Sequence, residues 1–161
     1  KFSKMRPIGF PTIRLAQLAS IYATYQTLFS TIIQLNNSQE FYKLFDKIEL
    51  NPFWETHYTF KNQSKSVNKK LSKDKINNLI INSFIPIRYA FERNNNEVEI
   101  DFYLDLLNEI EPEHNSILDE FERLGFVNKS AKDSQTLIHL KKRYCLEKKC
   151  LNCAIGHHIL R

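Results

Sequence analysis

Glycine and proline are scarce in this sequence, which has three glycines and five prolines among 161 residues. An all-β sandwich needs many tight turns, so this scarcity argues against that fold class. No apolar run reaches the roughly eighteen residues that a membrane span needs, and no signal peptide is present at the start. We therefore expect a helical protein that does not span a membrane.

Cysteine is also rare, and all three cysteines are confined to residues 144–161. An odd number of cysteines without a secretory signal is unlike a disulfide scaffold. These features favour a reduced protein, and we expect a cytoplasmic location.

Charge and length set further limits. The formal net charge of +5 is mildly basic, which suits a nucleic-acid or acidic partner without requiring one. A chain of 161 residues can bury a core without disulfides. We interpret residues 1–161 as a single helical domain. Because the chain starts at Lys1, ahead of its first methionine at Met5, we expect it to be the C-terminal part of a longer protein.

The spacing of apolar residues predicts an all-α fold of about six helices around one central helix. This central helix spans Ile76–Phe91 and is apolar on nearly every side. Pro86 lies inside it, where a proline removes a backbone hydrogen bond. We therefore predict a kink near Asn82–Pro86, with Asn82 buried so that it satisfies the freed backbone groups.

The other helices are predicted from apolar repeats and capping residues. The first begins at Pro11 and is expected to end near Asn36-Asn37. Its buried positions are expected to be Leu15, Leu18, Tyr22, Tyr25, Phe29 and Ile32. The expected capping elements are Ser38, Ser72, either Pro112 or Ser116, and a capping box formed by Ser130 and Asp133.

The segment 51–60 is rich in aromatic residues, including Trp54 and His57. Two interpretations stay open for it. Its rings could fill the gap between helices in an ordered loop, which we favour, or they could form a stacking surface for bases or a partner.

Lysines gather in the polar segment Lys61–Lys75, which we expect to be a solvated surface loop. A second basic cluster consists of Lys141, Lys142 and Arg143 near the end of a helix, where positive charge also suits the helix dipole. If the loop, with Lys69 and Lys70, shared a face with this cluster and with Lys148 and Lys149 just beyond it, these residues together could contact nucleic-acid phosphates.

The cysteines have the spacing C-x4-C-x2-C, at Cys145, Cys150 and Cys153. Structural zinc needs four ligands, and His157 or His158 could supply the fourth. An iron–sulfur cluster would need a histidine or a ligand from outside this chain. A redox pair of Cys150 and Cys153 and three simply buried thiols are the remaining alternatives.

Motifs of known enzymes are absent. The sequence has no glycine-rich phosphate loop, no G-x-S-x-G and no H-E-x-x-H motif. We therefore expect a non-enzymatic protein.

Five segments of the sequence resemble a bacterial family called domain of unknown function 2851. The segments are Arg6-Pro7-x-x-Phe10-Pro11-x-x-Arg14-Leu-Ala-Gln-Leu-Ala19, Trp54-Glu-Thr-His57-Tyr58-x-Phe60, Ile80-Ile-Asn82-x-x-Ile-Pro86, Ser134-Gln135, and Tyr144-Cys145-x4-Cys150-Leu-x-Cys153-x-Ile-Gly156. The resemblance implies that an upstream part precedes this region in full-length members, with motifs loosely similar to nuclease folds. It also implies that Arg6, Arg14, Trp54, His57 and Asn82 form a shared feature of the domain.

Three hypotheses follow. The leading one is a helical accessory domain that packs against an upstream domain of the same polypeptide. The second is a nucleic-acid-binding module that uses the lysine-rich loop and the basic cluster. The third is a metal- or redox-responsive protein that works through its cysteines.

Overall fold

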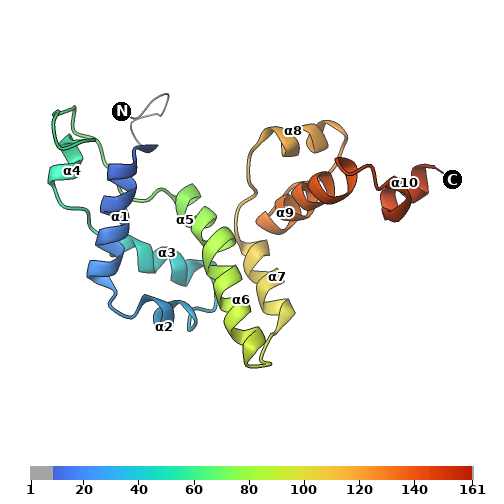
Figure 1. The fold of residues 1–161 in the computed structure, drawn as a ribbon, viewed down its shortest axis with the longest axis horizontal. Helices are drawn as coiled ribbons and strands as arrows, with labels where there is room; N and C mark the ends of the chain where they lie inside the picture. Colours follow the sequence, from blue (N-terminus) through green and yellow to red (C-terminus); the bar gives the residue numbers. More distant parts are fainter. Residues whose placement is uncertain (1–8, 161) are drawn as a thin grey trace. The chain divides into compact units, whose positions relative to one another are not determined.

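The computed structural model describes residues 9–160 and confirms the all-α fold (Figure 1). It divides into two compact units, Lys1–Glu97 and Val98–Arg161, which we call unit 1 and unit 2. This division does not test whether the chain is a single domain, so that interpretation stays a prediction. None of the helices between residues 9 and 160 has the length and apolar character of a membrane span.

Unit 1 holds most of the helices predicted for the first half of the chain, in shorter pieces. They are α1 (Pro11–Thr24), α2 (Leu28–Ile32), α3 (Ser38–Asp46), α4 (Phe53–Thr56), α5 (Lys73–Leu79), a π-helix (Ile80–Phe84) and α6 (Ile85–Asn94).

The predicted first helix ends earlier than expected. The prediction of its buried side was wrong at Leu15, Leu18, Tyr22 and Phe29, which are exposed, whereas Ile32 is buried as predicted. Pro11 does occupy its first turn, but the buried residues are Ile13, Ala16, Gln17 and Ile21. Tyr25 leaves the helix in an extended conformation, and its hydroxyl donates to the Leu44 carbonyl of α3 at 2.8 Å. That bond links the end of α1 to α3. Burial raises the pKa of Tyr25.

The core of unit 1 lies where α3 meets the central helical segment. Phe41 and Phe45 on α3 stack on Phe84, with ring centroids 5.6 and 5.8 Å apart. Ile80 is completely buried beside them. The cap of α3 is Asn37 and not the predicted Ser38, because the Asn37 side chain accepts a hydrogen bond from the Glu40 N–H.

The predicted disturbance near Pro86 takes the form of a π-helix directly before α6. The Ile85 N–H donates to the Ile80 carbonyl, five residues earlier, and Pro86 follows within the first turn of α6. Such π-turns are one of the recognised causes of irregularity in helices. Asn82 is exposed and not buried as predicted, although its side chain does donate to the Asn78 carbonyl at 3.1 Å.

The second half of the predicted central helix differs from expectation because α6 contains no buried residue. Ile87 and Phe91, predicted as core positions, are 51% and 39% exposed. Phe91 contacts Phe29 of α2 edge-on, with ring centroids 5.2 Å apart.

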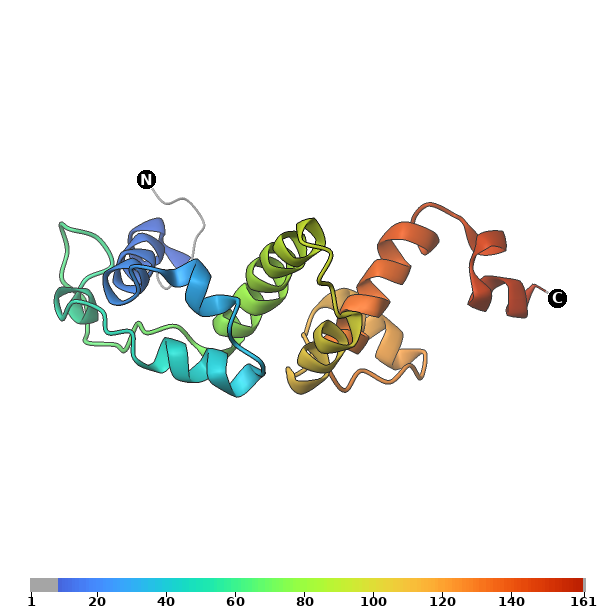
Figure 2. The same ribbon diagram turned by 90° about the horizontal axis from the view of Figure 1, so that it is seen from below.

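Unit 2 contains the remaining helices, which can be followed in Figures 1 and 2. They are α7 (Ile100–Glu109), α8 (Ser116–Arg123), α9 (Ala131–Leu140), a π-helix (Lys141–Cys145), a 3-10 helix (Cys150–Asn152) and α10 (Ala154–Ile159). Its core is built on Leu118, Phe121 and Leu137.

Helix starts in unit 2 are fixed by side-chain caps. Asn115 accepts hydrogen bonds from the N–H groups of Ile117 and Leu118, so it caps α8 in place of the predicted Pro112 or Ser116. The predicted cap at Ser130 is confirmed, since its hydroxyl accepts from the Asp133 N–H at 3.3 Å. The Asp133 carboxylate accepts from the Lys129 N–H, one residue before the expected partner.

Ser134 is completely buried at the centre of a small hydrogen-bond network in unit 2. Its hydroxyl accepts from the Glu113 N–H at 2.9 Å and lies 2.7 Å from the Asn128 side-chain oxygen. Gln135, the next residue, donates to the Glu113 carboxylate. The Ser134-Gln135 pair therefore holds the connection between α7 and α8 against α9.

Candidate functional site

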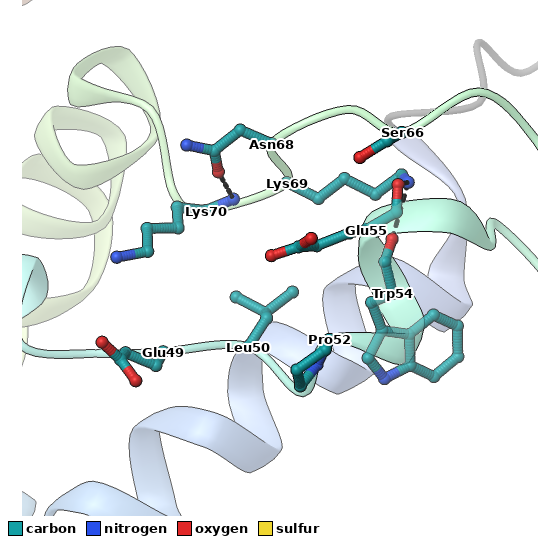
Figure 3. A pocket seen from close by; sticks show the side chains of 9 residues that line it. All are labelled: Glu49, Leu50, Pro52, Trp54, Glu55, Ser66, Asn68, Lys69 and Lys70. Carbon is teal, nitrogen blue, oxygen red and sulfur yellow. Dashed lines mark hydrogen bonds between the residues drawn. The ribbon is translucent and has the colours of Figure 1, made fainter.

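The candidate site of unit 1 is built around Lys69, a buried lysine that is only 4% exposed. Its ammonium donates to the carbonyl oxygens of Trp54 at 2.6 Å and Glu55 at 2.7 Å, both on α4. It also lies 4.1 Å from the centre of the Tyr58 ring, within the range of a cation–π interaction. The two carbonyl contacts fix the lysine-rich segment to α4 (Figure 3), and the Tyr58 ring adds a third contact just beyond that helix.

Helix α1 joins this network through Gln17, which is also buried. The Gln17 side-chain amide donates to the Lys69 carbonyl at 2.8 Å, and Arg14 donates to the Gln17 side-chain oxygen at 2.8 Å. Burial lowers the pKa of Lys69, and the nearby Glu55 carboxylate opposes that change. The prediction that this part of Lys61–Lys75 is a solvated loop was therefore wrong at Lys69, because Lys69 is part of the packed interior.

Lys70 is exposed and has a different environment from its neighbour. Its side chain points in the opposite direction to that of Lys69, along an open pocket of about 470 Å³ (Figure 3). Glu49 and Glu55 also line that pocket, so its charge is mixed.

A second, smaller cavity of about 190 Å³ has cations and no acidic residue in its lining. It lies between α1 and residues 68–75. Its lining consists of Ile13, Arg14, Gln17, Asn68, Lys69, Lys70, Ser72 and Lys75. With Lys69 engaged elsewhere, its available positive charge comes from Arg14, Lys70 and Lys75, which suits an anionic group.

The aromatic segment packs mainly on itself. The His57 ring stacks on Phe53 with centroids 4.0 Å apart, and its Nδ1 lies 3.0 Å from the Phe53 carbonyl oxygen. Trp54 packs edge-on against both Phe53 and Phe60. This arrangement supports the interpretation that the rings fill space around α4, although Phe60 is 75% exposed at its edge.

The predicted basic cluster belongs to unit 2, whereas the lysine-rich segment belongs to unit 1. Lys141 pairs with Glu120 at 2.9 Å, and that hydrogen bond raises the pKa of Lys141. Arg143 lies 4.0 Å from Glu147, while Lys142 is exposed. Acidic neighbours therefore offset much of this cluster's charge. Arg6, the other predicted basic contact, lies outside the described residues.

Helix α1 presents an apolar face that the described part of unit 1, residues 9–97, leaves uncovered. Leu15, Leu18 and Tyr22 are 63%, 47% and 59% exposed. An open groove of about 350 Å³ continues this face towards α5 and includes Ile21, Leu71 and Leu79. Arg14 and Lys75 also line the groove.

The three cysteines share an apolar pocket of about 430 Å³ in unit 2. Cys145 and Cys150 are exposed, and Cys153 is half-buried. The interpretation as buried thiols is therefore wrong for the first two. His157 contacts the cysteine segment through its backbone, since its N–H lies 2.8 Å from the Cys153 carbonyl oxygen.

The arrangement gives no support to a metal centre at the cysteines. Within residues 9–160, no three His, Cys, Asp or Glu side chains are grouped so that they could hold a metal ion. The zinc site at Cys145, Cys150, Cys153 and His157, and the iron–sulfur alternative, stay predictions.

Comparison with known proteins gives one result. A family model described as "Protein of unknown function (DUF2851)" matches residues 1–116. The chain belongs to this family. No curated protein and no solved structure matches it.

The DUF2851 match includes the network around Lys69 and ends at residue 116, before the cysteine pocket. Three residues of the predicted shared feature, Arg14, Trp54 and His57, lie on α1 and around α4, the elements that Lys69 and Gln17 join. Their positions give them a structural role within the DUF2851 region. Asn82 lies elsewhere, on the π-helix.

Sequence reasoning missed Gln17 and the burial of Lys69. Gln17 lies in the segment Arg14-Leu-Ala-Gln-Leu-Ala19, one of the segments that carry the family resemblance, and is one helical turn from Arg14. A polar residue among apolar neighbours on a predicted helix was the available signal. Nothing in the sequence distinguished Lys69 from Lys70.

Proposed function

We propose that unit 1 is an interaction domain that packs against an upstream part of the same polypeptide through the apolar face of α1. The observation that carries the proposal is the exposure of Leu15, Leu18 and Tyr22 on one helix. Contiguous apolar side chains on a surface mark interaction sites. In the same proposal the region acts by binding and not by catalysis.

The charges beside this face indicate the kind of segment that would cover it. Arg14 and Lys75 line the groove that continues the face, and no acidic residue lines it. An apolar segment that carries a carboxylate would therefore complement both the groove and its edge.

The inner side of α1 supports the same proposal because it is held firmly. Ile13 is 1% exposed, and Gln17 binds the Lys69 carbonyl. A helix fixed on its inner side presents its outer side without further ordering, which lowers the cost of binding.

The test is a calorimetric titration of this chain with the separately expressed upstream part. We expect binding by the wild type and at least roughly tenfold weaker binding by Leu15→Glu, the loss expected for a contact worth about 1.4 kcal/mol. Leu124→Glu is the matched control, because Leu124 is 68% exposed but belongs to unit 2. Absence of wild-type binding, or equal weakening by both variants, would contradict the proposal.

A second candidate function, nucleic-acid binding, is favoured by the acid-free cavity lined by Arg14, Lys70 and Lys75. It rests on unit 1 alone, since the basic cluster of unit 2 is largely paired with acids.

Fluorescence anisotropy with labelled single- and double-stranded oligonucleotides at low salt tests this candidate. We expect affinity that falls steeply with added salt and that is lost in a Lys70→Glu, Lys75→Glu double variant. Lys142→Glu is the control from unit 2. No binding at low salt would remove the candidate.

A further inference from the structure

Cys150 and Cys153 form the two ends of one hydrogen-bonded turn. Cys150 begins the 3-10 helix, and the Cys153 N–H donates to the Cys150 carbonyl at 3.2 Å. Residues three apart in a 3-10 helix lie almost directly above one another, and three steps of about 2 Å place their Cα atoms about 6 Å apart. That separation lies inside the range of about 4.4–6.8 Å found for disulfides.

The backbone of Gly156 holds this turn in place. A Cβ atom at Gly156 would lie 2.9 Å from the Cα atom of Cys150 and 3.0 Å from its carbonyl carbon. The turn therefore rests directly on α10, and only glycine permits this approach. The fixed turn keeps the Cα atoms of Cys150 and Cys153 close together.

Both thiols are accessible, but to different degrees. Cys150 is exposed and Cys153 is half-buried, and both line the apolar pocket with Cys145. An exposed thiol meets a small-molecule reagent first, and a nearby, more sheltered thiol can then complete the reaction. Access is one of the factors that set the rate of thiol–disulfide exchange.

We propose that Cys150 and Cys153 are a site of reversible disulfide formation by exchange with a small-molecule disulfide such as oxidised glutathione. The Cys150 thiolate attacks one sulfur of the reagent, forms a mixed disulfide and releases one glutathione thiolate. The Cys153 thiol then gives its proton to solvent, and its thiolate attacks the Cys150 sulfur and displaces the second glutathione thiolate. Two protein thiols are oxidised and one disulfide is reduced, so atoms and electrons balance.

Cys145 is the competitor for this reaction. It ends a separate π-helix, and its carbonyl accepts from the Lys148 N–H in the turn that follows. It has no shared turn with Cys150 of the kind that joins Cys150 and Cys153. Its thiol should therefore stay free when the pair is oxidised.

The experiment treats the reduced full chain with oxidised glutathione and maps the products by mass spectrometry of proteolytic peptides. We expect loss of two of the three free thiols, a mass decrease of two hydrogen atoms, and a link between Cys150 and Cys153. Dithiothreitol should reverse the change. A Cys153→Ser variant should instead accumulate a stable glutathione adduct on Cys150, while Cys145→Ser should behave as the wild type.

Three outcomes would overturn the proposal. They are a Cys145–Cys150 link as the main product, lasting glutathione adducts on both Cys150 and Cys153 of the wild type, and chains joined to one another in place of an internal bond. Circular dichroism of each variant in the reduced state checks that the helices are retained, so that a missing disulfide cannot be due to unfolding.

Discussion

A buried ammonium is unusual for a lysine, because burial removes its hydration. In Lys69 two carbonyl oxygens and one ring replace the water. These partners belong to α4 and to Tyr58, two residues beyond its end, so this side chain helps to tie a short helix of four residues to the rest of unit 1.

Replacing Lys69 by methionine should therefore destabilise unit 1. The methionine keeps much of the volume but leaves the Trp54 carbonyl without this donor, and an unsatisfied buried group costs about 1–3 kcal/mol. Urea unfolding followed by tryptophan fluorescence measures the loss.

The neighbouring substitution Lys70→Met is the control for this prediction. Lys70 is exposed, so its replacement should change the free energy of unfolding by no more than about 0.5 kcal/mol. Equal effects of the two substitutions would show that the contacts of Lys69 contribute nothing to stability.

Gly156 gives a second prediction at the scale of the residue. An alanine methyl group would collide with the backbone of Cys150, and overpacking of this kind costs about 1–3 kcal/mol. We expect Gly156→Ala to speed hydrogen exchange at the Cys153 and His157 amides, whose bonds define the turn and α10. Gly9→Ala should leave these rates unchanged, because no atom of residues 9–160 lies within 4 Å of the added methyl group.

Among the helices, α1 shows why a repeat in the sequence can indicate a helix and yet misplace its buried side. Apolar residues occupy both Ile13 and Ile21 on one side and Leu15 and Tyr22 on another. Both sets have helical spacing. The choice between them depends on Gln17, whose partner is a carbonyl 52 residues away in the chain and is not visible in a local pattern.

Two alanine substitutions test which side of α1 is buried. Ile13→Ala should cost about 2–5 kcal/mol, the usual range for truncation of a fully buried side chain. Leu15→Ala, at a position 63% exposed, should cost less than about 0.5 kcal/mol. If urea unfolding instead showed a larger loss of stability for Leu15→Ala than for Ile13→Ala, the buried side would be the one that the sequence predicted.

The caps of the helices give a second prediction at the scale of the element. The Asn115 side chain accepts two backbone N–H groups at the start of α8, so Asn115→Ala should cost about 1 kcal/mol in thermal or urea unfolding. Ser72 occupies the same position before α5 but makes no side-chain capping bond, so Ser72→Ala should be close to neutral. Equal losses would contradict this assignment of the caps.

For the whole molecule, the fold class and the family could be predicted from the sequence, because both depend on patterns that extend along the chain. Scarce glycine and repeated apolar spacing favour helices wherever they occur. The pairing of Lys141 with Glu120 could not be predicted, since those residues are 21 positions apart and meet only through the packing of α8 and α9. The same is true of the shared pocket of the three cysteines, to which Phe121 also contributes.

The division into units gives a prediction for unfolding. Leu118 belongs to the core of unit 2, while Trp54, the only tryptophan in the sequence, lies in unit 1. We expect Leu118→Ala to shift the urea transition seen by far-ultraviolet circular dichroism and to leave the transition seen by tryptophan fluorescence in place. If both transitions shift together, the chain unfolds as the single domain that the sequence predicted.

The enclosure of Lys69 also has a consequence for chemical labelling. Amine-reactive reagents need an unprotonated, accessible nitrogen, and the Lys69 nitrogen is enclosed by two carbonyl oxygens and the Tyr58 ring. Acetylation should therefore modify exposed Lys70 quickly and Lys69 only when residues 61–72 detach from α4. The ratio of the acetylation rates of Lys69 and Lys70 therefore measures how often residues 61–72 detach from α4.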